Sequence, residues 1–114
     1  MRSIKGWFRG LRRRFYALFP VKLMIVEGDL FPGQIPRRRL VLLYDDGPYA
    51  AAMLCPCGCR EVIELMVMEG VSPRWDVRVD DRSRPTLHPS IWRQSGCRSH
   101  FWVRGGRVVW CKPG

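Results

Sequence analysis

The sequence predicts a small, mainly β protein with one domain, and three observations support this prediction. Its 114 residues, 46% hydrophobic and 26% charged, suit a single globular core. Short runs rich in β-branched and aromatic residues alternate with turns rich in Gly, Pro and Asp. Gly105 and Gly106 separate the last two runs and predict a C-terminal hairpin. We expect an antiparallel sheet that carries a cysteine knuckle.

The first twenty residues differ from the rest and predict a basic amphipathic helix. Apolar side chains recur there at three- and four-residue spacing, and Pro20 ends the pattern. We expect the apolar face to dock on the remaining chain, while adhesion to membrane or nucleic acid is the functional alternative. The expected division is a helix over residues 1–20 and a cysteine-rich β domain over residues 21–114.

The charge and the cysteine count constrain the partners and the compartment. A net charge of +10 favours acidic partners, whether nucleic acid, anionic lipid or an acidic protein. No apolar run approaches the ~20 residues of a membrane helix, and arginines interrupt the N-terminus where a secretion signal would be apolar. We therefore expect a cytoplasmic protein, in which five cysteines serve thiol or metal chemistry instead of disulfides.

The first half of the β domain contains three strand candidates. Lys22–Val26 and Leu40–Tyr44 are short β-rich runs, joined by a Gly, Pro and Arg-rich connection. The turn sequence Asp45-Asp46-Gly47-Pro48 follows the second run and precedes Tyr49–Leu54. These last two runs are expected to pair as a hairpin that ends at the cysteine knuckle.

The middle of the chain gives weaker signals. Arg60–Met68 alternates poorly and only slightly favours a strand, whereas Trp75–Val79 alternates cleanly. Pro85 and Pro89 indicate that Thr86–Trp92 is irregular or an edge segment. A loop in this place is able to present side chains to a partner.

The C-terminal hairpin is the clearest predicted element. His100–Val103 and Arg107–Cys111 flank the two glycines of the turn. With the glycines as turn residues, His100 lies opposite Cys111, and Cys97 is one loop away. One face of the hairpin then carries His100, Trp102, Val109 and Cys111.

The cysteine spacing predicts a zinc site. Cys55, Cys57 and Cys59 lie within five residues of a Pro- and Gly-containing turn, which excludes a regular helix or strand. Zn²⁺ takes four thiolate or imidazole ligands in structural sites. We expect the ligands to be Cys57, Cys59, Cys97 and Cys111, with Cys55 as the spare. The alternatives are that His100 replaces one cysteine, or that the cysteines are reduced, small buried hydrophobic residues.

A serine and a histidine form the second candidate site. If four cysteines hold the metal, His100 remains as a candidate base for a serine nucleophile. Ser90, in the sequence His88-Pro89-Ser90, is preferred to Ser99, which adjoins His100 on an extended strand and points to the opposite face. Ser95 stays open as a nucleophile. A third, orienting member remains unranked among Asp76, Asp80 and Asp81.

Two other hydrolytic arrangements stay open. With three protein ligands, the zinc itself activates water, and Glu61 or Glu64 carries the proton. Alternatively, Cys111 forms a thiolate pair with His100.

Several segments together resemble the BubE family, small bacterial proteins encoded beside ubiquitin-like conjugation genes. The resemblance covers residues 54–111 and rests on the segments CPCGCREVIEL, PRWDVRVDD, TLHPSIW and GCRSHFWVRGGRVVWC. It implies a peptidase that trims the C-terminus of a ubiquitin-like protein or removes that protein from its targets, with that protein and its conjugation enzymes as partners. The residues that match the family pattern are Cys57, Cys59, Cys97, Ser90, Ser99 and His100. His88 departs from the pattern, which places a triad with His88 in doubt.

Two functions of different classes follow. The first is a peptidase or isopeptidase that uses Ser90 and His100, with Trp92, Trp102 and Trp110 lining a groove for an extended tail. The alternative is a zinc-ribbon-like module that binds nucleic acid through its charge and aromatic residues. No recognition helix is predicted after the cysteines, and this module would leave Ser90 and His100 without a role. The sequence therefore favours the hydrolase.

Overall fold

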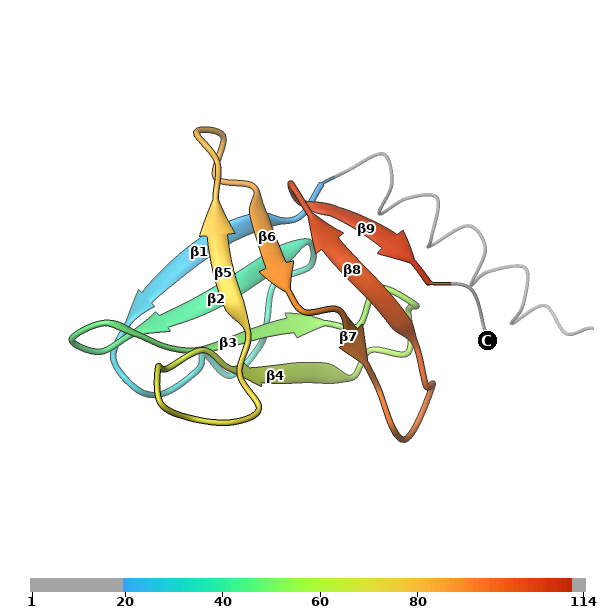
Figure 1. The fold of residues 1–114 in the computed structure, drawn as a ribbon, viewed down its shortest axis with the longest axis horizontal. Coiled ribbons are helices and arrows are strands. Elements are labelled where there is room, and N and C mark those ends of the chain that lie inside the picture. Colours follow the sequence, from blue (N-terminus) through green and yellow to red (C-terminus); the bar gives the residue numbers. More distant parts are fainter. Residues whose placement is uncertain (1–19, 112–114) are drawn as a thin grey trace, which may run out of the picture.

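A computed structural model describes residues 20–111 as an all-β protein of nine strands (Figure 1). No helix occurs in this part of the chain, and nothing in it is long and apolar enough to cross a membrane as a helix. The expected basic helix over residues 1–20, and with it the division of the chain into two parts, falls on residues outside the described range. The strands are β1 (Lys22–Glu27), β2 (Arg39–Tyr44), β3 (Pro48–Leu54), β4 (Val62–Met66), β5 (Asp76–Val79), β6 (Pro85–His88), β7 (Ile91–Trp92), β8 (His100–Arg104) and β9 (Arg107–Trp110).

Strands β1 to β4 form one sheet in sequence order. The pairs β2–β3 and β3–β4 are antiparallel, and Leu43 lies opposite Ala50. The expected hairpin across the Asp-Asp-Gly-Pro turn is confirmed, and so is a strand within Arg60–Met68. The alanine run at residues 50–52 is buried, which brings β3 close to the layer packed on it. β3 ends one residue before the cysteine knuckle, as expected.

The first strand pair corrects the expectation of a purely antiparallel sheet. β1 runs parallel to β2, with Leu23 opposite Leu40 and Val26 opposite Leu43. Parallel neighbours need a long crossover connection, and residues 28–38 supply it. The Pro- and Gly-rich composition of this connection was visible in the sequence, but its return direction was not.

The other strands form a second layer across the first sheet (Figure 1). β5 pairs with β6, and β7, β8 and β9 form a three-stranded sheet. β6 and β8 come together at the hairpin turn, where the Gly106 N–H donates to the Pro85 carbonyl at 2.8 Å. Thr86–Trp92, expected as an irregular or edge segment, contains most of β6 and all of β7, and both strands lie at the edges of their sheets. Pro85 begins β6 and Pro89 lies between the two strands, so neither proline removes an essential ladder bond.

The β8–β9 hairpin confirms the predicted register. Phe101 lies opposite Trp110 and Trp102 opposite Val109, and the Cys111 N–H donates to the His100 carbonyl at 2.9 Å. Gly105 and Gly106 have φ values of 55° and 78°, as a two-residue turn of this kind requires. A Cβ on Gly106 would lie 2.5 Å from the Val21 carbonyl oxygen, so only glycine fits this close approach to the chain before β1.

The core lies between the two layers and determines which side chains the second layer exposes. Phe101 and Val103 of β8 are 0% and 1% exposed and point into the core. The alternate residues, His100 and Trp102, are half-buried on the opposite, outer face. The members of the main core cluster are Val21, Leu40, Leu42, Ala51, Met53, Cys55, Cys57, Ile63, Leu65, Val67, Leu87, Ile91, Phe101, Val103 and Val108.

Candidate active site and metal centre

The cysteine knuckle is a tight turn between β3 and β4. The Cys55 N–H donates to the Glu61 carbonyl at 2.8 Å and closes the base of the turn. The Gly58 N–H donates to the Cys55 carbonyl at 3.3 Å, and Gly58 has a φ of 94°. A side chain at that position would strain the turn. The knuckle therefore directs several thiols toward one region, as its Pro and Gly residues indicated.

Cys97 lies at the tip of the β7–β8 hairpin. Ile91 pairs with Phe101, and the Arg93 N–H donates to the Ser99 carbonyl at 2.9 Å, which extends the ladder toward the tip. Gly96, with a φ of 67°, turns the chain just before Cys97. A segment 42 residues beyond Cys55 is thereby placed against the knuckle.

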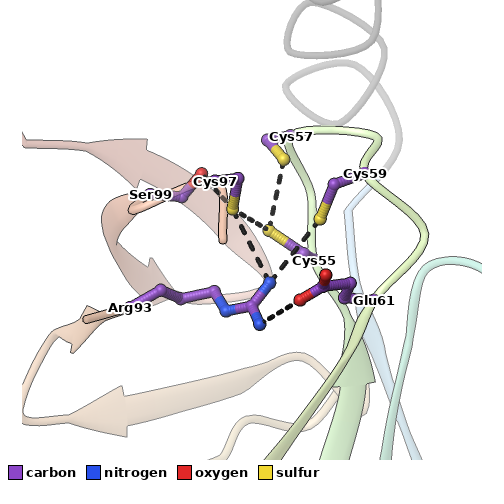
Figure 2. Close-up of polar contacts among 7 residues, drawn as sticks. All are labelled: Cys55, Cys57, Cys59, Glu61, Arg93, Cys97 and Ser99. Atoms are coloured by element: carbon purple, nitrogen blue, oxygen red, sulfur yellow. Dashed lines mark hydrogen bonds and ion pairs between the residues drawn. The ribbon is translucent and has the colours of Figure 1, made fainter. Parts of the chain in front are cut away.

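Four cysteine sulfurs form a compact cluster (Figure 2). All ligand atoms of the cluster lie within 4.8 Å of one another. The Cys55 sulfur lies 3.4 Å from that of Cys57 and 3.6 Å from that of Cys97. Tetrahedral zinc with bonds of about 2.3 Å separates its sulfur ligands by roughly 3.8 Å, so the cluster has the dimensions of a four-thiolate zinc site. The cluster consists of Cys55, Cys57, Cys59 and Cys97.

The predicted set of ligands and the observed cluster differ in one cysteine. Cys55, expected to be the spare thiol, belongs to the cluster, whereas Cys111 lies outside it. Cys111 continues the β9 ladder opposite His100, and the hairpin register directs it to the outer face. Cys55 is 2% exposed and points into the interior beneath the knuckle. His100 does not belong to the cluster either, so the variant with His100 as a ligand has no support in this arrangement.

Arg93 is a cluster neighbour that the sequence analysis missed. Its guanidinium N–H groups donate to the sulfurs of Cys59 and Cys97, each at 3.6 Å, and another pairs with the carboxylate of Glu61 (Figure 2). The ion pair with Glu61 raises the pKa of Arg93 and keeps it cationic. Four thiolates around one Zn²⁺ would carry two net negative charges, which this cation would partly offset. Arg93 is one of 20 basic residues, and its local sequence contains no signal that separates it from the others.

The protonation of the thiols differs across the cluster. Burial is the main cause that raises the pKa of Cys55 and of Cys59. Burial also disfavours the thiolate of Cys97, but hydrogen bonds from Ser99, and then from Cys57 and Cys55, outweigh it and lower the pKa of Cys97 to about 6. The lowered pKa favours the thiolate of Cys97, while metal binding must displace the protons of Cys55 and Cys59.

Ser90 and His100 meet on the outer side of the same hairpin. Ser90 lies between β6 and β7, and His100 is the first residue of β8. The Ser90 Oγ is 3.0 Å from Nε2 of His100, a hydrogen-bond distance, and Nε2 accepts the hydroxyl proton when the imidazole carries its own proton on Nδ1. Both residues are half-buried. This is the geometry of a nucleophile beside its base.

Two tryptophans, Trp75 and Trp92, contact this pair. The Trp75 indole N–H donates to the Ser90 carbonyl at 3.3 Å and ties the serine to the chain before β5. The Trp92 ring stacks on the His100 imidazole, with centroids 4.9 Å apart and an interplanar angle of 10°. Trp92 had been placed in a substrate groove by the sequence analysis, and Trp75 had been given no site role.

The other candidate groups have different contacts. Ser99 is 6% exposed, and its hydroxyl lies 3.2 Å from the Cys97 sulfur, which assigns it to the cluster. Asp76 pairs with Arg74 and Arg78. The Trp110 ring packs against Phe101, on the face opposite the pair. The Asp80 carboxylate accepts hydrogen bonds from two backbone N–H groups of its own loop. Glu61 is paired with Arg93, and His88 lies against Trp102. The remaining candidates are exposed: Asp81, Ser95 and Glu64.

Together these features define a class of small β protein in which a four-cysteine cluster adjoins a hairpin with a serine–histidine pair. The chain belongs to the BubE family, because the family model described as "Bacterial ubiquitination-like system serine protease (BubE)" matches residues 27–111. The resemblance seen in the sequence is thereby confirmed. No curated protein and no solved structure matches the chain. The matched region includes the cluster, Ser90 and His100.

Proposed function

We propose that the protein is a serine peptidase of a bacterial ubiquitination-like system, with Ser90 as its nucleophile and His100 as its general base. Its substrate would be a peptide or isopeptide bond at the C-terminus of a ubiquitin-like protein, cleaved during precursor processing or deconjugation. The observation that carries this proposal is the 3.0 Å distance between the Ser90 Oγ and Nε2 of His100. The description of the family as a serine protease supports the same residue type as nucleophile.

The chemistry follows from this distance. His100 Nε2 removes the hydroxyl proton as the Ser90 Oγ attacks the substrate carbonyl carbon, forming a C–O bond and a tetrahedral oxyanion. Nε2 then returns the proton to the departing amine as the C–N bond breaks, which leaves an ester on Ser90. Water, deprotonated by the same nitrogen, hydrolyses the ester and restores the hydroxyl. One base within hydrogen-bond reach of the nucleophile serves both halves of the reaction.

The cluster is assigned a structural role in this proposal. Cys55, Cys57, Cys59 and Cys97 would hold Zn²⁺, and four thiolate ligands would leave the metal no water to activate. When bound, zinc supplies a cross-link between the knuckle and the hairpin tip. Glu61, the proton carrier in the zinc-hydrolase alternative, is paired with Arg93 instead. Free thiols at all five cysteines suit a reducing compartment such as the cytoplasm.

The surroundings of the pair suit an extended acidic tail. Trp102 lies on the outer face of β8, and the Arg104 guanidinium lies 4.5 Å from the centre of its ring. The net charge of +10 attracts an acidic partner. A nucleic-acid-binding module would share this charge but would not require Ser90 to lie beside His100. The hydrogen bond between them therefore favours the hydrolase.

A labelling experiment tests the proposal without knowledge of the natural substrate. A fluorophosphonate probe reacts with activated serines, and a ubiquitin-like precursor of such a system, followed by mass, reports cleavage. We expect Ser90→Ala to abolish labelling and His100→Ala to slow it at least about 10³-fold, since loss of either member of such a pair removes most of its rate enhancement. Ser95→Ala, a change in an exposed serine of the same hairpin tip, is the matched control and should label normally. Labelling or cleavage that survives Ser90→Ala would refute the assignment.

A further inference from the structure

Trp92 occupies a position that core packing does not explain. It is 60% exposed although it adjoins the buried Ile91 on the same short strand. Its ring stacks on the imidazole of His100, its partner in the β7–β8 register. A large apolar side chain left in water contributes little to folding, so the stack on His100 is the feature that needs a reason.

Among the residues that the structure describes, no carboxylate orients the imidazole of His100. In serine peptidases with a triad, a carboxylate holds the histidine ring and stabilises the positive charge that it gains. Within residues 20–111, no carboxylate forms an ion pair with His100. Asp76, one of the three candidates for this role, pairs with Arg74 and Arg78, and Asp80 binds the backbone N–H groups of Arg82 and Arg84.

We propose that Trp92 is the positioning residue of the pair and performs both tasks that a carboxylate performs in a triad. The nearly parallel stack, 4.9 Å between centroids, fixes the plane of the imidazole and keeps Nε2 directed at the Ser90 Oγ. When His100 accepts the serine proton, the face of the indole stabilises the resulting cation, because aromatic faces attract positive charge and tryptophan does so most strongly. This inference rests on the proposed function, since it concerns the same reaction.

The contacts on the other sides of His100 leave this task to Trp92. Ser90 takes Nε2, and the backbone N–H of Cys111 donates to the carbonyl oxygen of His100. The ring of His88 lies tilted against that of Trp102, two residues along β8, with an interplanar angle of 48°. Trp92 is the aromatic ring that lies flat on the imidazole among the residues that the structure describes.

The test measures the activation of Ser90 with a small fluorophosphonate, which needs no peptide groove. In that reaction the Ser90 Oγ–P bond forms, the P–F bond breaks, fluoride departs and the serine proton passes to His100. We expect Trp92→Leu to slow labelling about tenfold and Trp92→Phe, which retains a stacking ring, to remain within about threefold of the wild type. Tyr44→Leu removes an exposed aromatic residue of β2 and should have no effect.

A second readout is independent of the reaction. In the Ser90→Ala protein, the ring protons of His100 should show upfield NMR shifts from the Trp92 ring current and cross-relaxation with the indole. Trp92→Phe should keep a smaller upfield shift, and Trp92→Leu should abolish it. Absence of cross-relaxation in the protein with Trp92 would overturn the inference even if Trp92→Leu failed to fold.

The possible failures are distinguishable. If Trp92→Leu is labelled at the wild-type rate while Ser90→Ala is not labelled, Trp92 has no role and the proposed function survives. If Trp92→Phe is as slow as Trp92→Leu, a stacked ring is not what matters, and the inference is again overturned. If Ser90→Ala is still labelled, the proposed function itself fails, and with it this inference.

Discussion

The cysteine cluster and the Ser90–His100 pair lie on neighbouring parts of one hairpin, but they are built differently. Two thiols of the cluster are 2% exposed, its sulfurs are packed within 4.8 Å, and Arg93 closes one side of it. The pair is half-buried, shares one hydrogen bond, and lies under a tryptophan that is mostly in water. A closed site with every ligand in place fixes geometry, whereas a site that reacts must remain accessible. The cluster therefore suits a structural role, and the pair suits the proposed reaction.

The two regions are connected by very few residues. Ile91 and Trp92 separate Ser90 from Arg93, and the Arg93 side chain is anchored on the cluster. On the returning strand, the Ser99 hydroxyl contacts the Cys97 sulfur, directly before His100. Displacement of the cluster would therefore shift both members of the pair. We therefore expect loss of the cysteine cluster to abolish the proposed serine reactivity, and loss of Ser90 or His100 to leave the cluster intact.

The largest effect should come from removing the metal. We expect the purified protein to contain one zinc ion, and chelation, or Cys57→Ser, to lower the Tm by more than about 10 °C and abolish fluorophosphonate labelling, because site formation and folding are linked. Atomic absorption and thermal denaturation provide the measurement. Ser90→Ala, in contrast, should keep its zinc and its Tm. A protein that lacks metal as purified, or that labels normally after chelation with an unchanged Tm, would contradict the structural role.

A smaller effect should follow from changing Arg93, the link between the two regions. We expect Arg93→Met to weaken zinc binding about tenfold to a hundredfold in competition with a chelator, as loss of groups that contact metal ligands usually does. Labelling of Ser90 should also slow severalfold. The ion pair with Glu61 should add little, because that carboxylate is half-exposed.

Two variants control the Arg93 experiment. Arg93→Lys keeps the charge but cannot reach both sulfurs and the carboxylate at once, so it should fall between the wild type and Arg93→Met. Arg78→Met removes an exposed arginine, paired with Asp76, from the same layer and should leave zinc affinity unchanged. Equal zinc affinity in Arg93→Met and the wild type would show that the contacts with the sulfurs have no energetic role.

The smallest effect is expected from substitution of Cys111. This residue belongs to the predicted ligand set but not to the observed cluster. Cys111→Ser should retain one zinc ion, change the Tm by no more than about 2 °C and leave labelling within about twofold of the wild type, as conservative changes outside the core usually do. Cys55→Ser should instead lose the metal. The reverse result would restore the original assignment, with Cys111 as the fourth ligand and Cys55 as the spare.

Local chemistry explains how much of this site was predictable. The Gly105-Gly106 turn fixes the register of the C-terminal hairpin, and the turn at Asp45–Pro48 fixes the pairing of β2 and β3. Cys57, Cys59 and Cys97, which the sequence analysis expected as ligands, all belong to the cluster. Ser90 and His100, chosen by excluding Ser99 on strand geometry, lie at hydrogen-bond distance. Each of these inferences used neighbours along the chain or directly across a hairpin.

By itself, the sequence determined the β class, the register of the C-terminal hairpin, the pairing of β2 with β3, the family and most of the residues of the cluster and of the candidate pair, because turns and side-chain alternation act over a few residues. Only the tertiary structure decided that β1 runs parallel to β2, that Cys55 and not Cys111 completes the cluster, and that Arg93 bridges to it. These outcomes depend on where the long 28–38 connection returns and how the two layers pack. Contacts between distant segments are fixed by that packing, which no local pattern encodes.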